Sequence, residues 1–131
     1  SPTMNEAPAY GSSFSRGMAL TINGRTVIYV SGTASIDTEG RILHVGDLEG
    51  QVHRMIENVE ALLGTRGTTF DDVVSAITYL KRPEYLDTFY RIWDERGLPG
   101  DIPNTVSMAD VCRPEWLCEI EVIAVFPEDR G

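Results

Sequence analysis

Two glutamates, Glu119 and Glu121, stand in a segment whose other residues favour burial. The segment runs from Cys112 to Phe126 and reads CRPEWLCEIEVIAVF. A carboxyl group that is removed from water keeps its proton to a higher pH, and it can then donate that proton to a substrate near neutral pH. Proton transfer is therefore the chemistry that this segment could perform, although a solvent-exposed glutamate on a strand would fit the same pattern.

Hydroxyl groups form a second set of side chains that could face a ligand. In the run from Ile28 to Ile36, apolar residues alternate with hydroxyl-bearing ones that include Ser35, so one face of a strand would be polar. Such hydroxyls can hydrogen-bond a polar ligand or position a water molecule, and they are equally typical of ordinary strands. The candidates are Ser31, Thr33, Thr105 and Ser107.

The other reactive residue types give little support for metal or nucleophilic chemistry. The chain has two cysteines and two histidines, which do not complete a zinc site of known spacing. His44 and His53 fall before and on a predicted helix, so neither is an evident base for a nucleophilic Cys112. We expect reduced thiols, a structural or substrate-shaping Cys112, no metal and, since no dinucleotide or phosphate-binding motif is present, no cofactor.

Local signals predict the elements that must position these residues. Asn23-Gly24 is the residue pair preferred in two-residue hairpin turns, and Asp47 and Pro83 are typical helix starts. On the second helix, one face would carry Leu86, Phe89, Tyr90 and Trp93. The predicted elements are a hairpin around Asn23-Gly24, a helix from Asp47 to Gly64 or Gly67, a strand over 73–80, a helix from Pro83 to Gly97, and strands over 104–111 and 116–126.

This order predicts a two-layer α+β domain, with a mixed β-sheet and two helices on one face of it. On the last strand, the even-numbered positions from Cys118 to Phe126 would pack beneath the helices. Ile123 and Val125 would stand on the opposite face with the two glutamates. Because two helices on one side cannot bury both faces, we expect a second chain to cover Ile123 and Val125.

Length and charge limit the kind of partner. A chain of 131 residues suits one domain, which we place at residues 13–127 after a flexible N-terminal arm of residues 1–12. The sequence contains neither a membrane-spanning apolar run nor a secretory signal pattern, so we predict a cytoplasmic protein. A net charge of −9 repels phosphate backbones, which makes a small molecule a better ligand than a nucleic acid.

Several segments are together similar to the YjgF/Rid family, which includes proteins named endoribonuclease L-PSP. They are APAYGSSFSRG, VSGTASIDTEGRI, the helix pattern Q followed by IENVEALL, IPNTVSMADV and CEIEVIAVF, and they extend from about Ala7 to Phe126. The resemblance implies the chorismate-mutase-like YjgF fold. It also implies a homotrimer whose sheets form a central barrel, with three clefts between subunits, which would explain the two-faced last strand.

Deaminase members of this family hydrolyse 2-imino acids to 2-keto acids, and an arginine binds the substrate carboxylate. In this chain the corresponding segment is IPNTVS, so Thr105 falls on the arginine position. A guanidinium can bind both carboxylate oxygens at once, whereas a threonine hydroxyl cannot. Arg113 is a candidate replacement, with Arg16 and Arg82 as alternatives, and each of them also fits an ordinary solvated arginine.

The resemblance assigns further positions to the cleft. They are Phe14 for an aromatic residue before the first hairpin, Ser31 and Gly32 for a serine-glycine pair after it, Phe89 for a helix position that is often asparagine, Ser107 for a cysteine, and Glu119 for the acid of the final strand. Phe89 also fits the core. Glu121 lacks such support and is expected to form an ion pair or hydrogen bond at the subunit interface.

A second resemblance is to the C-terminal half of chorismatases, enzymes that hydrolyse or eliminate the enolpyruvyl group of chorismate. It rests on SSFSRG, VSGTASI, GDLEGQ and ADVCRPEWLCEIE. In chorismatases a variable residue lies seven positions before the essential glutamate, as Cys112 lies before Glu119. Because this chain is too short for both halves, a chorismatase reaction would require the trimer to build the pocket.

These observations predict a cofactor-free enzyme that acts on a small carboxylated or polar metabolite in inter-subunit clefts. The reaction would be hydrolysis, water addition or tautomerisation of an imine, enol ether or enol. The alternative is a noncatalytic ligand-binding or regulatory trimer. The candidate catalytic residues are Glu119, Ser31 and Cys112, and the candidate substrate-binding residues are Phe14, Gly32, Thr33, Phe89, Thr105, Ser107 and Arg113.

Overall fold

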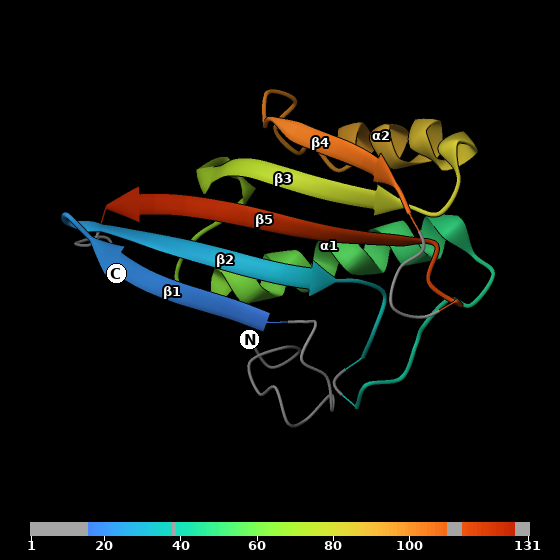
Figure 1. Ribbon diagram of the computed structural model, residues 1–131, viewed down its shortest axis with the longest axis horizontal. Coiled ribbons are helices and arrows are strands. Elements are labelled where there is room, and N and C mark those ends of the chain that lie inside the picture. The colour runs from blue at the N-terminus through green and yellow to red at the C-terminus, as the bar shows by residue number, and fades with distance from the viewer. Residues whose placement is uncertain (1–15, 38, 110–113, 128–131) are drawn as a thin grey trace.

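The hairpin turn at Asn23-Gly24 forms as predicted. Both residues have positive φ, 52° and 75°, which is the backbone geometry of a two-residue turn that matches the twist of its strands. The turn joins β1 (Arg16–Ile22) to β2 (Arg25–Thr33), and the two strands pair antiparallel. The computed structural model describes residues 16–37, 39–109 and 114–127 (Figure 1), so the predicted arm lies outside the described residues.

Strand β5 (Cys118–Pro127) lies in the middle of the sheet. The strand order is β1-β2-β5-β3-β4, with β3 at Val73–Leu80 and β4 at Asn104–Met108. β5 pairs antiparallel with both β2 and β3, whereas β3 and β4 are parallel. The predicted mixed sheet is confirmed, and the last strand has a neighbour on each side.

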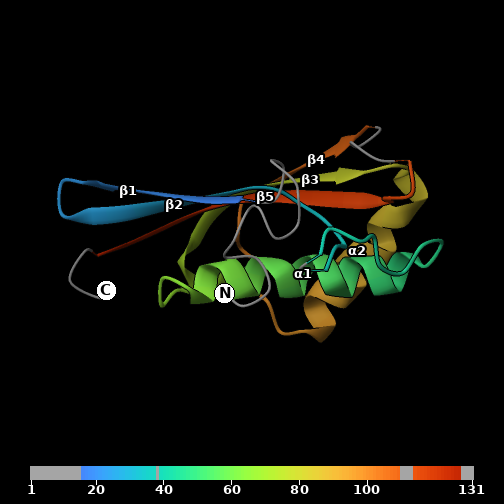
Figure 2. The ribbon, with the colours of Figure 1, turned by 90° about the horizontal axis from the view of Figure 1, so that it is seen from below.

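Both helices cover the same side of this sheet (Figure 2). Helix α1 (Leu48–Gly64) begins at Asp47, whose side chain accepts a hydrogen bond from the Gly50 amide at 3.0 Å. Helix α2 (Leu86–Glu95) follows a short 3-10 helix, η3 (Pro83–Tyr85), and another, η2 (Phe70–Asp72), precedes β3. Of the residues predicted to share a face of α2, Phe89 and Trp93 are buried and Tyr90 is 42% exposed, while Ile92 is also buried.

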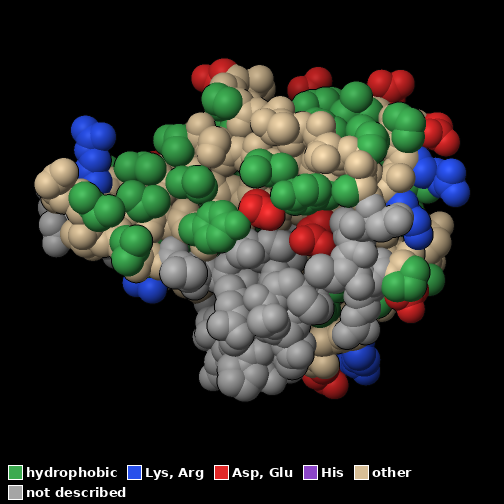
Figure 3. Space-filling view, viewed as in Figure 1, with side chains coloured by type: hydrophobic (Ala, Val, Ile, Leu, Met, Phe, Trp, Pro, Cys, Tyr) green, Lys and Arg blue, Asp and Glu red, His purple; other side chains and the backbone are tan. Residues whose placement is uncertain are grey.

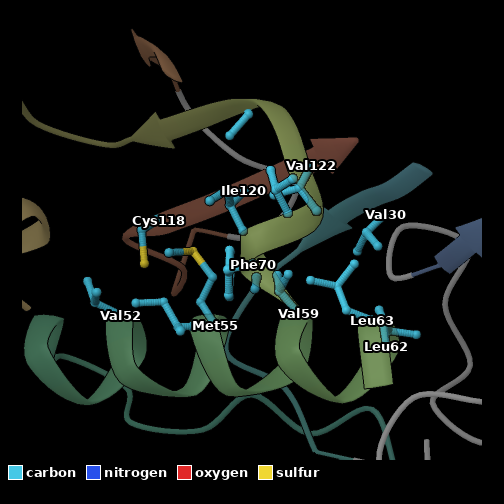
Figure 4. Packing of buried hydrophobic residues seen from close by; sticks show 14 of the residues in the cluster. Val30, Val52, Met55, Val59, Leu62, Leu63, Phe70, Cys118, Ile120 and Val122 are labelled. Carbon is cyan, nitrogen blue, oxygen red and sulfur yellow. The ribbon is translucent and has the colours of Figure 1, made fainter. Parts of the chain in front are cut away.

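The core lies between α1 and the central strand. Side chains of α1 point toward the sheet, where they meet Cys118, Ile120 and Val122 of β5 (Figure 4). The even-numbered positions of β5 are at most 4% exposed, as the alternation along the strand predicts. The α1 residues that line this layer include Val52, Met55, Val59, Leu62 and Leu63.

A β-bulge interrupts β2 beside the predicted polar stripe. Val30 pairs with Val122 and Thr33 pairs with Ile120, so β2 has one residue more than β5 in this interval. The alternation of faces therefore does not continue past the bulge. Ser35, which was predicted to share the polar face, is fully buried, and its hydroxyl donates to the Leu43 carbonyl at 2.9 Å.

Gln51 anchors the chain where it enters β5. This fully buried amide donates from Nε2 to the carbonyls of His44 and Glu115 at 3.1 and 2.9 Å, and its Oε1 accepts from the Leu117 amide at 2.8 Å. The indole of Trp116 donates to the Ser35 carbonyl at 3.1 Å. Together these hydrogen bonds fix the two residues that directly precede Cys118.

We predict that Gln51→Leu lowers the free energy of unfolding by about 3 kcal/mol, because it removes the three hydrogen bonds that the buried Gln51 amide makes to the backbone of His44, Glu115 and Leu117. Urea denaturation followed by circular dichroism would measure the change. Glu57→Leu on the exposed face of the same helix is the control and should change stability by less than about 0.5 kcal/mol. Equal effects of the two substitutions would contradict the anchoring role of Gln51.

Candidate functional site

Glu119 and Glu121 lie on the face of β5 that the helices leave open. Tyr79 of β3 is opposite Glu119 in the antiparallel register, and Ile77 is opposite Glu121. Paired residues in an antiparallel sheet direct their side chains to the same face. Figure 3 shows this face, on which acidic side chains lie among hydrophobic ones.

Glu119 is a buried acid with an incomplete set of hydrogen bonds. It is 8% exposed, and its Oε1 atom is buried without a hydrogen-bond partner among the described residues. Burial, followed by the negative charge of Glu121, raises the pKa of Glu119 from 4.5 to about 7. Near neutral pH the carboxyl therefore exists in both protonation states, which suits a group that gives and takes a proton.

Two tyrosines from different strands hold the carboxylate of Glu121. The Tyr29 hydroxyl of β2 donates to Oε1 at 2.7 Å, and the Tyr79 hydroxyl of β3 donates to Oε2 at 3.2 Å. Burial raises the pKa of Tyr79, and the nearby Glu121 and Glu119 carboxylates raise it further. The expected hydrogen bond of Glu121 therefore forms within one chain. Neither phenol was predicted as a site residue, and only the position of Tyr29 in an alternating strand indicated this face.

Strand β4 directs hydroxyl groups to the same face. Thr105 pairs with Ile77 and Ser107 pairs with Tyr79 in the parallel register of β3 and β4. Neighbouring strands lie about 4.8 Å apart, which places the β4 backbone about 10 Å from that of β5. Thr105 is exposed and Ser107 is half-buried. Across β4, β3 and β5, the register thus aligns Thr105, Ile77 and Glu121 in one row. It aligns Ser107, Tyr79 and Glu119 in a second row.

The other predicted site residues fall into three groups. Phe14, Cys112 and Arg113 lie outside the described residues. Ser31, Gly32 and Thr33 form the end of β2 at the bulge, and their side chains are also outside the described part. Phe89 is fully buried in the core, with its ring 5.6 Å from that of Trp93, so the structure does not bring it to the open face.

Apolar side chains share this face with the acids. Leu20 and Ile22 of β1 are 58% and 54% exposed, and Ile77 is 37% exposed. Ile123 and Val125 of β5 are half-buried. The turn end of the β1–β2 hairpin extends past the helices (Figures 1 and 2), so the helices do not cover its apolar residues. The acids thus lie in an apolar surface that is poorly hydrated once it is covered.

The described side chains support acid–base chemistry more than any other type. Among them, no group of three or more histidine, cysteine, aspartate or glutamate residues could hold a metal ion. Burial and the Glu119 carboxylate raise the pKa of the Cys118 thiol to about 12, so this cysteine stays protonated and unreactive at neutral pH.

Neither helix in the described part of the chain has the length and apolar character that a membrane span requires.

Comparison with known proteins agrees with this architecture. A family model described as endoribonuclease L-PSP matches residues 4–126. The fold is similar to that of the Rid family protein YyfA from Yersinia pestis, with a TM-score of 0.73, 23% identity and coverage of 92% of this chain and 95% of that one. It is also similar to RidA from an Antarctic Psychrobacter, with a TM-score of 0.74, 20% identity and coverage of 95% and 98%.

A chorismatase structure is similar to part of the same fold. It matches 83% of this chain with a TM-score of 0.75 and 28% identity. The chain spans only 35% of the length of that chorismatase. The remaining part of the larger enzyme therefore has no counterpart within this one chain.

We predict that the stability of the protein falls as pH rises from about 4.5 to about 7, because the folded state holds the Glu119 proton more tightly than the unfolded state. The Glu119→Gln substitution removes this dependence. At about pH 8 it should raise the free energy of unfolding by about 2–3 kcal/mol, with a much smaller difference at about pH 5. Urea denaturation at both pH values measures the effect, with Glu84→Gln on exposed η3 as the control. A difference between the variant and the original protein that does not change with pH would contradict the prediction.

Proposed function

The chain belongs to the endoribonuclease L-PSP family, the YjgF/Rid family, and from this premise we propose that it is an enzyme in which Glu119 transfers a proton to a small polar or carboxylated metabolite. The reaction would be hydrolysis, water addition or tautomerisation at an imine, enol ether or enol. The observation that carries the proposal is the buried Glu119, whose Oε1 has no partner among the described residues and whose pKa is raised to about 7.

Each step of this chemistry has a group to perform it. The neutral Glu119 carboxyl donates its proton to the substrate atom that gains electron density, and the resulting carboxylate can take a proton from an attacking water. Ser31 and the backbone amides near Gly32 and Ser107 would hold the oxygen on which charge develops. The bulge at Ser31-Gly32 supports this role, since bulges leave backbone groups unpaired beside active sites.

Thr105 argues against standard 2-imino acid deamination. The family position that carries the carboxylate-binding arginine in deaminases is a threonine here, and this exposed residue lies in the row that ends at Glu121. A threonine hydroxyl offers one donor and no charge, so it cannot bind both carboxylate oxygens. The similarity to a chorismatase over 83% of this chain makes an enol ether a better candidate than a 2-imino acid.

A homotrimer would complete the site. The helices cover one face of the sheet, while the other exposes Leu20, Ile22 and Ile77 around the acids. An apolar face of this kind is typically covered by another chain. Three copies that join through these faces would form a central barrel with clefts between subunits, and they would supply the surface that the larger chorismatase provides within one chain.

We predict a native mass of three chains, measured by native mass spectrometry or light scattering. Leu20→Glu should shift the mass toward one chain, because it places a charge in the apolar face. Val45→Glu is the matched control: Val45 is 64% exposed but lies outside the sheet, and its substitution should leave the mass unchanged. A single-chain mass for the original protein would contradict the trimer.

We predict that Glu119→Gln reduces turnover at least about 100-fold, since the amide keeps the shape of the side chain and cannot transfer the proton. The assay supplies purified protein with chorismate and, separately, with freshly generated 2-imino acids, and follows product formation. Glu84→Gln on exposed η3 should retain full activity. Full activity of Glu119→Gln would show that Glu119 is not the acid.

The second candidate is a noncatalytic trimer that binds or senses a small ligand. The threonine at position 105 favours it, because a cleft that loses its carboxylate-binding arginine can lose catalysis and still bind. Thermal stabilisation of the protein by chorismate or a keto acid, without turnover of any substrate in the assay above, would select this function over the enzymatic one. Ribonuclease activity is a third possibility within the family, and the net charge of −9 disfavours it.

A further inference from the structure

Hydrogen bonds from both neighbouring strands hold the Glu121 carboxylate in place, unlike that of an ordinary solvent-exposed strand glutamate. Its two carboxylate oxygens accept separate hydrogen bonds, one from Tyr29 of β2 and one from Tyr79 of β3. The phenols approach from opposite sides because β5 lies between these strands. In both contacts the tyrosine hydroxyl donates and the Glu121 carboxylate accepts, which is the pattern expected of an ionised carboxylate. Glu121 therefore contributes a negative charge whose position is set by three strands.

Glu119 differs from Glu121 although only one residue separates them. It is buried, and its Oε1 lacks a hydrogen-bond partner among the described residues. Residues two apart on a strand direct their side chains to the same face, with Cα atoms about 7 Å apart. That separation is shorter than the screening length of about 8 Å at physiological ionic strength. The charge on Glu121 therefore acts on Glu119 with little screening.

Two titratable groups flank this pair on the open face, one from each neighbouring strand. In the described part of the chain they are Tyr79 of β3 and Tyr29 of β2, while the Cys118 thiol of β5 lies on the opposite, core-facing side. On β4, the aligned Thr105 and Ser107 carry no charge. Glu121 is thus the described group whose charge opposes ionisation of Glu119.

We propose that Tyr29 and Tyr79 are positioning residues that hold the Glu121 anion beside Glu119, and that this anion keeps Glu119 protonated so that it meets the substrate as a proton donor. The three residues do not touch the reacting atoms. They act through Glu119, whose pKa burial raises and the Glu121 charge raises further. The contribution of that charge requires it to stay in a fixed place, because a flexible glutamate would turn toward water instead.

If the protein has the proposed function, this arrangement also limits which chemical group of the substrate can lie beside Glu119 and Glu121. The group that faces Glu119 and Glu121 must accept a proton and must not be an anion, because a third negative charge beside these two would be repelled. The carbon atom of an enol ether or the nitrogen of an imine meets both conditions. A substrate carboxylate would have to point away from Glu121.

Carboxyl ¹³C chemical shifts of the full chain test the positioning role without any substrate. The Glu119 signal, assigned by its loss in Glu119→Gln, should titrate with a midpoint near 7 in the original protein. Glu121→Gln should lower that midpoint by about one pH unit or more. Tyr29→Phe/Tyr79→Phe should lower it by about half as much, since it releases Glu121 and keeps its charge. Glu84→Gln is the control and should leave the midpoint unchanged.

An unchanged midpoint in Glu121→Gln would overturn the proposal, and an unchanged midpoint in the double tyrosine variant would overturn the part assigned to the phenols. The tyrosine variant also covers the case in which Glu121→Gln does not fold. Both titrations are independent of turnover, so they stand even if the protein has no enzymatic activity. If a substrate is converted, Glu121→Gln should lower kcat/KM about tenfold at about pH 8 and little at about pH 5, whereas a purely structural loss would be equal at both.

Discussion

Strand β5 has the hydrophobic core on one face and the open face of the sheet on the other. The pairing register of β5 decides where every side chain of the candidate site lies. Its even-numbered positions complete the core beneath α1, and its odd-numbered positions from 119 to 125 carry the two acids and two apolar residues. A slip of one residue would exchange these faces, placing Glu119 and Glu121 in the core and Ile120 and Val122 outside. The cost of burying two carboxylates without partners would be large. The hydrophobic core thus fixes the position of the acids.

Side-chain hydrogen bonds hold the segment that leads into β5, in addition to the backbone pairing of the strand itself. Gln51 hydrogen-bonds the backbone of Glu115 and Leu117 just before Cys118, and the Trp116 indole donates to the Ser35 carbonyl. Both side chains are fully buried. Such a polar anchor specifies where the strand begins, because any other register would leave the buried amide and indole without partners. The same helix residue that supports the fold therefore supports the location of Glu119. Rigid elements of this kind are better suited than loops to hold a proton-transfer group.

The parts of this structure that follow from local signals were predictable from the sequence. Asn23-Gly24, the Asp47 cap and the β-branched strand from Val73 to Leu80 each depend on residues that are close in the chain. The open face was also predictable from the alternation along β5, since two helices cannot cover both faces. The family resemblance assigned Glu119, Thr105 and Ser107 to one cleft, which stays a prediction, and the sheet register directs all three to the open face.

Interactions between distant segments were not predictable from residue spacing. Tyr29 and Tyr79 reach Glu121 from 92 and 42 residues away, and their convergence requires β5 to lie between β2 and β3. The bulge on β2 likewise depends on pairing with β5, and it changes the face expected for residues after Val30. Ser35, which follows β2, is buried together with its neighbours Ala34 and Ile36. A period of two identifies a strand, but it does not reveal where the strand gains a residue.

The residue at position 105 influences the protonation of Glu119, as the tyrosine-bound Glu121 does. An arginine at this position would place a cation in the row that ends at Glu121, about 10 Å from β5. That cation would oppose the effect of Glu121 and favour the ionised form of Glu119. A threonine adds no charge, so the negative field of Glu121 acts on Glu119 without this opposition. The uncharged Thr105 therefore agrees with the raised pKa of Glu119, which burial and the Glu121 charge cause. A face without a cation at this position attracts carboxylates less, and for the same reason it leaves the Glu119 proton in place for a substrate that must receive one.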